Sequence, residues 1–219
     1  MGRLIYVEGI VSAGKSTYAK EVGKRLNYRV FEEPVDKKHL DRFYKDPARY
    51  AFAFQIYILH KRIGIQNLAA AEALYSDRWD GAIVDRSLFG DSAFAELHAE
   101  EGNIAPLDME AYRAAKHNMQ LMIWPPTTLV FLDVQPCVAL SRLKERLEKS
   151  KGDRDFELGV TLEYLQKLRH AYKRLIVAAK DGTYPWSHAV SVVHTQWDPK
   201  TVTAEEWDAV AEGLREDWS

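Results

Sequence analysis

Short apolar runs alternate along the chain with longer segments of helical periodicity. Residues 4–7 (Leu-Ile-Tyr-Val) form the first run, and similar runs recur towards the C-terminal end. This alternation is typical of a parallel sheet covered by helices. The pattern predicts strands at about 3–9, 28–32, 81–85, 128–134 and 189–195. It predicts helices at about 15–26, 48–75, 88–101, 107–123, 135–149, 160–180 and 203–215.

The chain is expected to form one α/β domain. It has 219 residues, 47% of them hydrophobic, which is enough to bury a sizeable core. We find no internal repeat, low-complexity tract or long linker that would divide residues 1–219 into two domains. The expected architecture is a five-stranded parallel sheet flanked by helices.

Charge and composition exclude several classes of partner. A formal net charge of -2 gives no concentrated basic face, so neither nucleic acid nor an anionic membrane surface is expected as a partner. The single cysteine, Cys137, excludes an internal disulfide and suits a reducing compartment. No run of about 18 apolar residues predicts a membrane span, and the first strand leaves no room for a signal peptide. A cytoplasmic location is therefore expected.

A complete phosphate-binding motif lies between the first strand and the first helix. Residues 9–17 (the phosphate loop) read Gly-Ile-Val-Ser-Ala-Gly-Lys-Ser-Thr, which matches G-x-x-x-x-G-K-[ST]. Its glycines let backbone N–H groups point at a phosphate at the helix N-terminus. An ordinary glycine turn is the alternative, and the strand–loop–helix context disfavours it. We expect a nucleoside triphosphate to bind through Gly9, Ser12, Ala13, Gly14, Lys15, Ser16 and Thr17.

Charged residues follow the second and third strands, where ligands of such sheets gather. The second strand ends in Glu32-Glu33-Pro34-Val35, and the proline fixes the direction of Glu33 by holding it extended. A solvated strand-end carboxylate is the alternative for Glu33. The third strand runs into Asp85-Arg86-Ser87, whose aspartate resembles the acidic position that holds Mg²⁺ in phosphate-loop enzymes.

Two predicted helices carry polar residues on one face. Arg142 and Arg146 are four residues apart in the helix at 135–149, and a polar segment follows that suits a lid at about 146–158. A solvated, salt-bridged helix remains the alternative. In the helix at 48–75, residues 52–68 are apolar almost all round, which predicts burial on several sides. Gln55 and Arg62 share a face there and need polar partners, either from the fold or from a ligand.

These motifs together resemble the deoxyribonucleoside kinases, from about residue 3 to 195. The phosphate loop is shared with many families. The ordered set of Glu33-Pro34-Val35, Phe54-Gln55 and Asp85-Arg86-Ser87, followed by an arginine-rich lid, is much more specific. The resemblance implies a P-loop kinase fold, a homodimer, and transfer of the γ-phosphoryl group of ATP to the 5′-hydroxyl of a deoxynucleoside.

The resemblance implies a role for each motif. Glu33 would be the general base for the 5′-hydroxyl, and Arg86 beside it would keep the carboxylate ionised. Ser16 and Asp85 would hold Mg²⁺. The phosphates of ATP would be bound by the basic residues Lys15, Arg142, Arg146 and Arg154.

The resemblance also implies a sugar site and a base site. Tyr44, eleven residues before Gln55, and Glu157, three residues after Arg154, would bind the 3′-hydroxyl. Phe54 and Gln55 would contact the base.

Base choice would depend on Arg62 and Asp91. They lie seven residues after Gln55 and six after Asp85, as in members that accept deoxycytidine and purine deoxynucleosides rather than thymidine. The alternative for Asp91 is an acidic residue in a first helical turn, where the helix dipole favours it.

The chain also departs from the family pattern. Lys38 stands where many members have tryptophan, and Phe94 lies one position before the expected stacking phenylalanine, where this chain has Ala95. Extra residues separate Arg146 from Arg154. These departures bear on the shape of the base pocket and the lid, not on phosphoryl transfer.

Three other functions are weighed against this one. A thymidylate or other nucleoside-monophosphate kinase shares the fold, but it needs basic groups near the acceptor where Glu33 offers a carboxylate. A GTPase-like switch would need an Asn-Lys-x-Asp element, which the chain lacks. A non-enzymatic subunit should have lost parts of the site, whereas this chain retains Lys15, Ser16, Glu33, Asp85 and Arg86.

Overall fold

The computed structural model describes residues 2–34, 36–185, 191–195, 198 and 201–216. Five parallel strands in this part of the chain form one sheet in the order β2-β3-β1-β4-β5. The strands are β1 (Arg3–Glu8), β2 (Tyr28–Phe31), β3 (Gly81–Asp85), β4 (Thr128–Leu132) and β5 (Ser191–Thr195). The predicted α/β class and five-stranded sheet are confirmed. Val35 and the first two residues predicted for the last strand, 189 and 190, lie outside the described residues.

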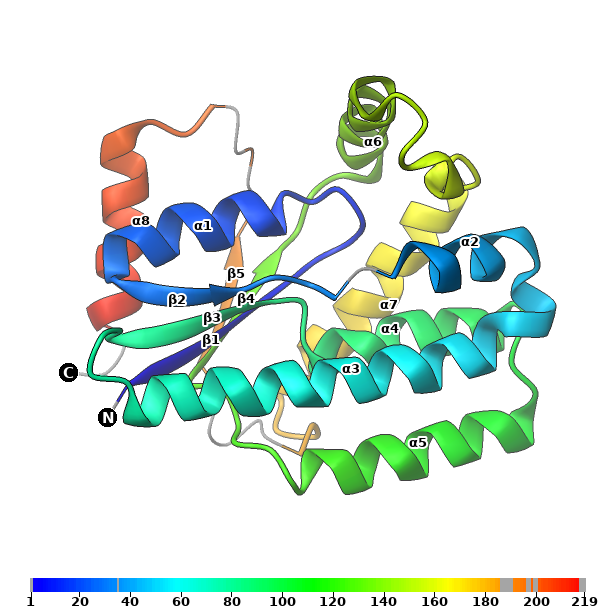
Figure 1. Ribbon diagram of the computed structural model, residues 1–219, viewed down its shortest axis with the longest axis horizontal. Coiled ribbons are helices and arrows are strands. Elements are labelled where there is room, and N and C mark those ends of the chain that lie inside the picture. The colour runs from blue at the N-terminus through cyan, green and yellow to red at the C-terminus, as the bar shows by residue number, and fades with distance from the viewer. Residues whose placement is uncertain (1, 35, 186–190, 196–197, 199–200, 217–219) are drawn as a thin grey trace.

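Helices cover both faces of the sheet (Figure 1). The elements are α1 (Lys15–Leu26), α2 (Lys37–Lys45), α3 (Pro47–Tyr75), α4 (Leu88–Glu100), α5 (Pro106–Gln120), α6 (Pro136–Ser150), the short 3-10 helix η1 (Asp155–Glu157), α7 (Leu162–Lys180) and α8 (Ala204–Glu216). In Figure 1, α1 and α8 lie on one side of the sheet, and α3, α4, α5 and α7 lie on the other. None of the helices in the described residues is both long and apolar enough to cross a membrane.

The central strand β1 is enclosed on both faces. Leu4, Ile5, Tyr6 and Val7 are almost completely buried, as is usual for a parallel strand between two helical layers. The register pairs Val7 with Asp85 and Glu8 with Phe131, so β1, β3 and β4 end at the same edge. The phosphate loop and the charged residues after β3 are therefore brought to one edge of the sheet.

The helix α2 was not predicted from the sequence. Eight of its nine side chains are at least partly exposed, and Phe43 is its buried residue. Asp36 caps the helix by accepting hydrogen bonds from two backbone N–H groups. The Phe43 ring stacks on Phe54 of α3 and meets the edge of His98 on α4. Because α2 depends on these distant aromatic contacts, local periodicity does not reveal it.

The long helix α3 is more exposed than its sequence predicts. Its buried residues, among them Gln55, Leu59, Arg62 and Gln66, recur every three or four positions and so form one face. Leu68 is 63% exposed. The expectation that residues 52–68 are buried on several sides is therefore wrong, because the helix covers the sheet as an outer layer.

Candidate active site

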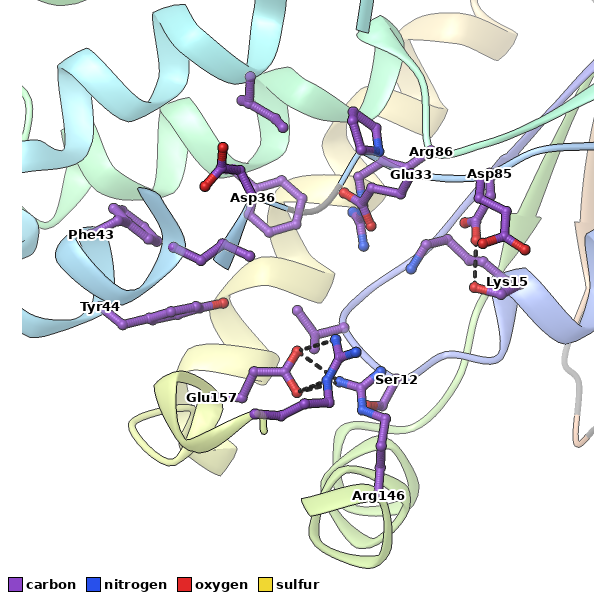
Figure 2. A pocket seen from close by; sticks show the side chains of 18 of the residues that line it. Ser12, Lys15, Glu33, Asp36, Phe43, Tyr44, Asp85, Arg86, Arg146 and Glu157 are labelled. Carbon is purple, nitrogen blue, oxygen red and sulfur yellow. Dashed lines mark hydrogen bonds and ion pairs between the residues drawn. The ribbon is translucent and has the colours of Figure 1, made fainter. Parts of the chain in front are cut away.

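A cavity of about 730 Å³ opens beyond the carboxyl ends of β1, β2 and β3. The phosphate loop forms one end of it, and α2, α3 and α6 form its walls (Figures 1 and 2). Most of the predicted site residues line this cavity. They are Ser12, Gly14, Lys15, Ser16, Thr17, Glu33, Tyr44, Phe54, Gln55, Arg62, Asp85, Arg86, Arg142, Arg146, Arg154 and Glu157.

The phosphate loop has the backbone conformation that its glycines predict. Gly14 has φ +95° and precedes α1 directly. Gly9 has φ +153°, and a Cβ there would lie 2.9 Å from the carbonyl oxygen of Leu132. Ala13 is completely buried, and its N–H donates to the Ile10 carbonyl at 3.2 Å. Gly9 and Ala13 therefore shape the loop, and the residues that follow face the cavity.

Lys15 lies at the floor of the cavity. Its side chain is buried, and Nζ donates to the carbonyl of Ile10 at 3.1 Å. Burial and the positive charge of Arg86 lower the pKa of Lys15 to about 8, although Asp85 and Glu33 oppose this shift. Such a desolvated cation is suited to bind an anion that restores its charge balance.

One carboxylate oxygen of Glu33 forms ion pairs with two arginines. Arg86 Nε and Arg62 Nη2 approach Glu33 Oε1 at 2.7 and 2.8 Å. Burial would raise the pKa of Glu33, but the charges of Arg86, Arg62 and Lys15 outweigh it and lower the pKa to about 2. Within the described residues Oε2 has no hydrogen-bond partner, and the side chain remains 28% exposed. Figure 2 shows this carboxylate facing Lys15 across the cavity.

The two residues predicted to hold Mg²⁺, Ser16 and Asp85, contact each other. Ser16 Oγ donates to Asp85 Oδ2 at 2.5 Å, while the buried Oδ1 has no partner in the described part of the chain. Burial and the charge of Glu33 raise the pKa of Asp85, with Lys15 opposing. A hydroxyl and an unpaired carboxylate oxygen fit Mg²⁺, which keeps several ligands from water and phosphate. The described residues hold no cluster of three or more His, Cys, Asp or Glu side chains suited to a metal.

Polar groups close the opposite end of the cavity. Gln55 is 1% exposed, and its Oε1 has no partner among the described residues. Arg62 contacts Asp91 through Nη1 and Glu33 through Nη2. Asp91 is completely buried behind Arg62 and also accepts a hydrogen bond from Tyr112 OH at 2.6 Å. Asp91 can therefore affect a ligand through Arg62 rather than by lining the cavity.

Aromatic, aliphatic and acidic side chains that were not predicted as site residues also form part of the wall. They include Asp36, Leu40, Phe43, Tyr57 and Ile58. Phe43 stacks on Phe54 with ring centroids 4.6 Å apart, and Tyr57 OH donates to Asp36 at 2.9 Å. Asp36, Leu40 and Phe43 lie on or beside α2, so predicting that helix would have been the signal for them. Tyr57 and Ile58 lie on α3, which was predicted, but no motif singled them out.

Of the two positions at which the chain departs from the family pattern near the base pocket, Phe94 lies at the cavity and Lys38 is exposed. Phe94 lines the cavity, and the guanidinium of Arg86 lies 4.7 Å from its ring centroid. Ala95 is completely buried. Lys38 is exposed on α2.

The predicted lid residues meet one another at the cavity mouth. Glu157 is 6% exposed and accepts hydrogen bonds from Arg146 and Arg154, at 2.8–2.9 Å and 3.0 Å. Tyr44 points towards Glu157 in Figure 2. Arg142 donates to the Ala13 carbonyl of the phosphate loop and pairs with Asp198 at 2.7 Å.

Comparison with known proteins gives a consistent result. A family model described as deoxynucleoside kinase matches residues 5–211. The chain is 36% identical over 176 residues to the deoxyadenosine kinase of Dictyostelium discoideum, covering 80% of this chain and 67% of that protein. It is 33% identical over 179 residues to the deoxyguanosine kinase of the same organism, covering 81% of this chain and 60% of that protein.

A solved structure shares the fold over nearly the whole chain. It is a deoxyadenosine kinase from M. mycoides with the products dCMP and a flexible dCDP bound. The TM-score is 0.74 at 28% sequence identity, and the match covers 97% of this chain and 98% of that chain.

Proposed function

The chain belongs to the deoxynucleoside kinase family, and from that premise we propose that it transfers the γ-phosphoryl group of ATP to the 5′-hydroxyl of a deoxynucleoside. The family and the P-loop kinase fold expected from the sequence are confirmed, as is the class of phosphotransferase. The proposal rests on the position and the contacts of the Glu33 carboxylate. It stands between the phosphate loop and the unpaired amide of Gln55, with one oxygen held by arginines and the other open.

The acceptor hydroxyl would be deprotonated by Glu33. A general base must lie within hydrogen-bond reach of the proton it takes, and Glu33 Oε2 faces the cavity without a competing donor among the described residues. Arg86 and Arg62 keep the carboxylate ionised at neutral pH by lowering its pKa against the effect of burial. The same arginines fix its orientation through Oε1.

The donor phosphates would lie over the phosphate loop. Lys15 would exchange its contact with the Ile10 carbonyl for the β- and γ-phosphates. Ser16 and Asp85 would hold Mg²⁺, which neutralises charge on the β- and γ-oxygens. Arg142 already contacts this loop, and Arg146 and Arg154 stand at the mouth of the same cavity.

The nucleoside would extend from Glu33 towards α3. Its 3′-hydroxyl would meet Tyr44 and Glu157, and its base would stack beside Phe54 and meet Gln55 and Arg62. Asp91 would fix Arg62 from behind. Arg62, held by Asp91, would occupy space that a thymine methyl group would need, which favours deoxyadenosine, deoxyguanosine or deoxycytidine over thymidine. The names of the two Dictyostelium relatives support testing the purine nucleosides first.

A nucleoside monophosphate is the competing acceptor. Its phosphate would bring a second negative charge close to the Glu33 carboxylate. Arg86 and Arg62 are both engaged with Glu33 in this position. A second anion there would compete with the carboxylate, so the geometry favours a neutral nucleoside over thymidylate.

Homodimer formation remains a proposal. Its support is that Phe52, Ile56 and Ile63, which pack against the core but are only half-buried, align along one side of α3. Light scattering after gel filtration would test it: the expected mass is twice 25.1 kDa, and a Phe52→Arg, Ile56→Arg variant should elute as a monomer. A monomeric wild-type protein would overturn the proposal.

An ADP-release assay tests the proposed reaction. Mg-ATP is offered with each of the four deoxynucleosides and with thymidine monophosphate, and turnover is expected with deoxyadenosine, deoxyguanosine or deoxycytidine. Glu33→Gln should retain ATP binding and lose roughly 10²–10⁴-fold in kcat. Activity confined to the monophosphate would replace this function with that of a monophosphate kinase. An undiminished rate in Glu33→Gln would remove Glu33 from the mechanism.

A further inference from the structure

A series of buried hydrogen bonds lies behind the part of the cavity wall that Arg86 forms. It starts at Glu8, the last residue of β1, which is completely buried. Glu8 Oε1 accepts hydrogen bonds from Ser87 N at 2.8 Å, Ser87 Oγ at 2.6 Å and Gly90 N at 3.1 Å. Glu8 Oε2 accepts from Tyr172 OH at 3.0 Å, and that hydroxyl accepts from Arg86 Nη1 at 2.5 Å. Elements distant in sequence therefore converge on one guanidinium group.

Contacts on three sides fix the orientation of the Arg86 guanidinium. Nε pairs with Glu33 at 2.7 Å, Nη1 donates to Tyr172, and the ring centroid of Phe94 lies 4.7 Å away. Within the described residues Nη2 has no partner, and Arg86 lines the cavity. The Tyr172 hydroxyl therefore sets the direction in which Nη2 points.

The backbone around this group leaves little room for adjustment. Arg86 has φ +65°, a left-handed conformation that a residue with a Cβ rarely adopts. At Gly90 a Cβ would lie 2.6 Å from Tyr172 OH and closer still to the Glu8 carboxylate. Strained backbone of this kind persists where its surroundings over-determine it, and it concentrates at functional sites.

We propose that Tyr172 is a positioning residue, anchored by Glu8, that orients Arg86 so that Nη2 meets the acceptor oxygen while Nε stays on Glu33. The inference rests on the proposed function, because it assigns a reacting oxygen to that place. A purely structural role would be served by an apolar side chain, since a buried phenol and a buried carboxylate carry a desolvation cost. Burial disfavours the charge of Arg86, but Glu33, Tyr172 and Glu8 raise its pKa, so the arginine remains a cation.

A double-mutant cycle tests this coupling. Tyr172→Phe removes the hydroxyl and keeps the ring, which stacks on Phe131. We expect kcat to fall about 10-fold or more, the usual scale for losing a hydrogen bond to a charged group, with KM for both substrates changed less than about threefold. In an Arg86→Lys background the same substitution should have no further effect on kcat. If instead the kcat losses of Tyr172→Phe and Arg86→Lys multiply in the double variant, Tyr172 does not act through Arg86.

Two further variants separate positioning from stability. Tyr184→Phe is the matched control, because its hydroxyl also has a short hydrogen bond, from Gln120 at 2.6 Å, and its ring also packs against another aromatic ring, that of Phe89. It should lower the melting temperature about as much as Tyr172→Phe while leaving kcat unchanged. Glu8→Gln should reproduce the kcat loss of Tyr172→Phe, and combining the two should add nothing. Equal kcat losses in the Tyr172 and Tyr184 variants would overturn the proposal.

A crystal structure of Tyr172→Phe provides a readout that needs no activity. The guanidinium of Arg86 is expected to leave Glu33 Oε1, and an unmoved guanidinium would overturn the proposal. The two proposals fail in different ways. A wild-type enzyme that phosphorylates no deoxynucleoside refutes the proposed function, whereas an active wild type with an independent Tyr172 refutes only the positioning role.

Discussion

Substitution of Glu33 by glutamine tests the electrostatics of the cavity through protein stability. Arg86 Nε and Arg62 Nη2 contact the carboxylate at 2.7 and 2.8 Å, and the charge of Lys15 also acts on it. Burial favours the protonated acid, yet these three cations lower the pKa of Glu33 from 4.5 to about 2. The folded protein therefore binds a proton at this position less readily than the unfolded chain does.

The size of the effect follows from proton linkage. A carboxylate whose pKa is lowered by folding stabilises the fold at neutral pH and loses that contribution on acidification. For Glu33 the contribution is complete above about pH 4.5 and is lost as the pH falls towards about 2. A pKa difference of about 2.5, at about 1.4 kcal/mol per pH unit, corresponds to about 3 kcal/mol.

Urea unfolding between pH 7 and the lowest pH at which both proteins fold would measure this contribution. The free energy of unfolding of wild type minus that of Glu33→Gln should shrink by up to about 3 kcal/mol across the range. Glu32→Gln is the matched control, because the neighbouring carboxylate is 63% exposed and pairs only with the exposed Lys20 among the described residues. The free energy of unfolding of wild type minus that of Glu32→Gln should vary by less than about 1 kcal/mol over the same pH range. A Glu33→Gln difference that stays constant with pH would refute the reasoning.

Three further predictions concern the two ends of the cavity. kcat/KM for ATP should fall as the pH rises through about 8, because Lys15 in the free enzyme then loses its charge; a profile flat to pH 9.5 would contradict this. Gly9→Ala should weaken ATP binding at least about tenfold in calorimetry, because the added Cβ would lie 2.9 Å from the Leu132 carbonyl at φ +153°; unchanged affinity would argue against the loop geometry. Replacing Arg62 and Asp91 together by small apolar residues should shift the kcat/KM ratio towards thymidine; an unmoved ratio would remove this pair from base selection.

The sequence predicted the parts of the fold that depend on local pattern. Strand runs such as residues 4–7 and the phosphate loop carry their information in consecutive residues, so the sheet and the loop–helix junction were found. The helix α2 was missed because one buried side chain, Phe43, holds it through contacts with residues far along the chain. The part of the cavity wall that α2 provides, including Leu40 and Phe43, was missed with it.

Residue types at motif spacing also identified most of the cavity lining, but not how those residues pair. Spacing placed Arg62 and Asp91 near the base, yet it could not show that Arg62 also holds Glu33. The link from Glu8 to Tyr172 joins residues 164 positions apart. Such pairs depend on tertiary packing, which a single sequence does not reveal.

The low pKa of Glu33 constrains when the acceptor proton can move. An alcohol is about as weak an acid as water, whose pKa is about 15.7, whereas the Glu33 carboxylate has a pKa of about 2. Forming a full alkoxide beforehand would cost about 19 kcal/mol at about 1.4 kcal/mol per pH unit. A turnover of about 10 per second allows a total barrier of only about 16 kcal/mol. In the proposed reaction a carboxylate whose pKa is lowered is a weak base, which favours a proton that leaves late, once bonding to phosphorus has made the hydroxyl more acidic.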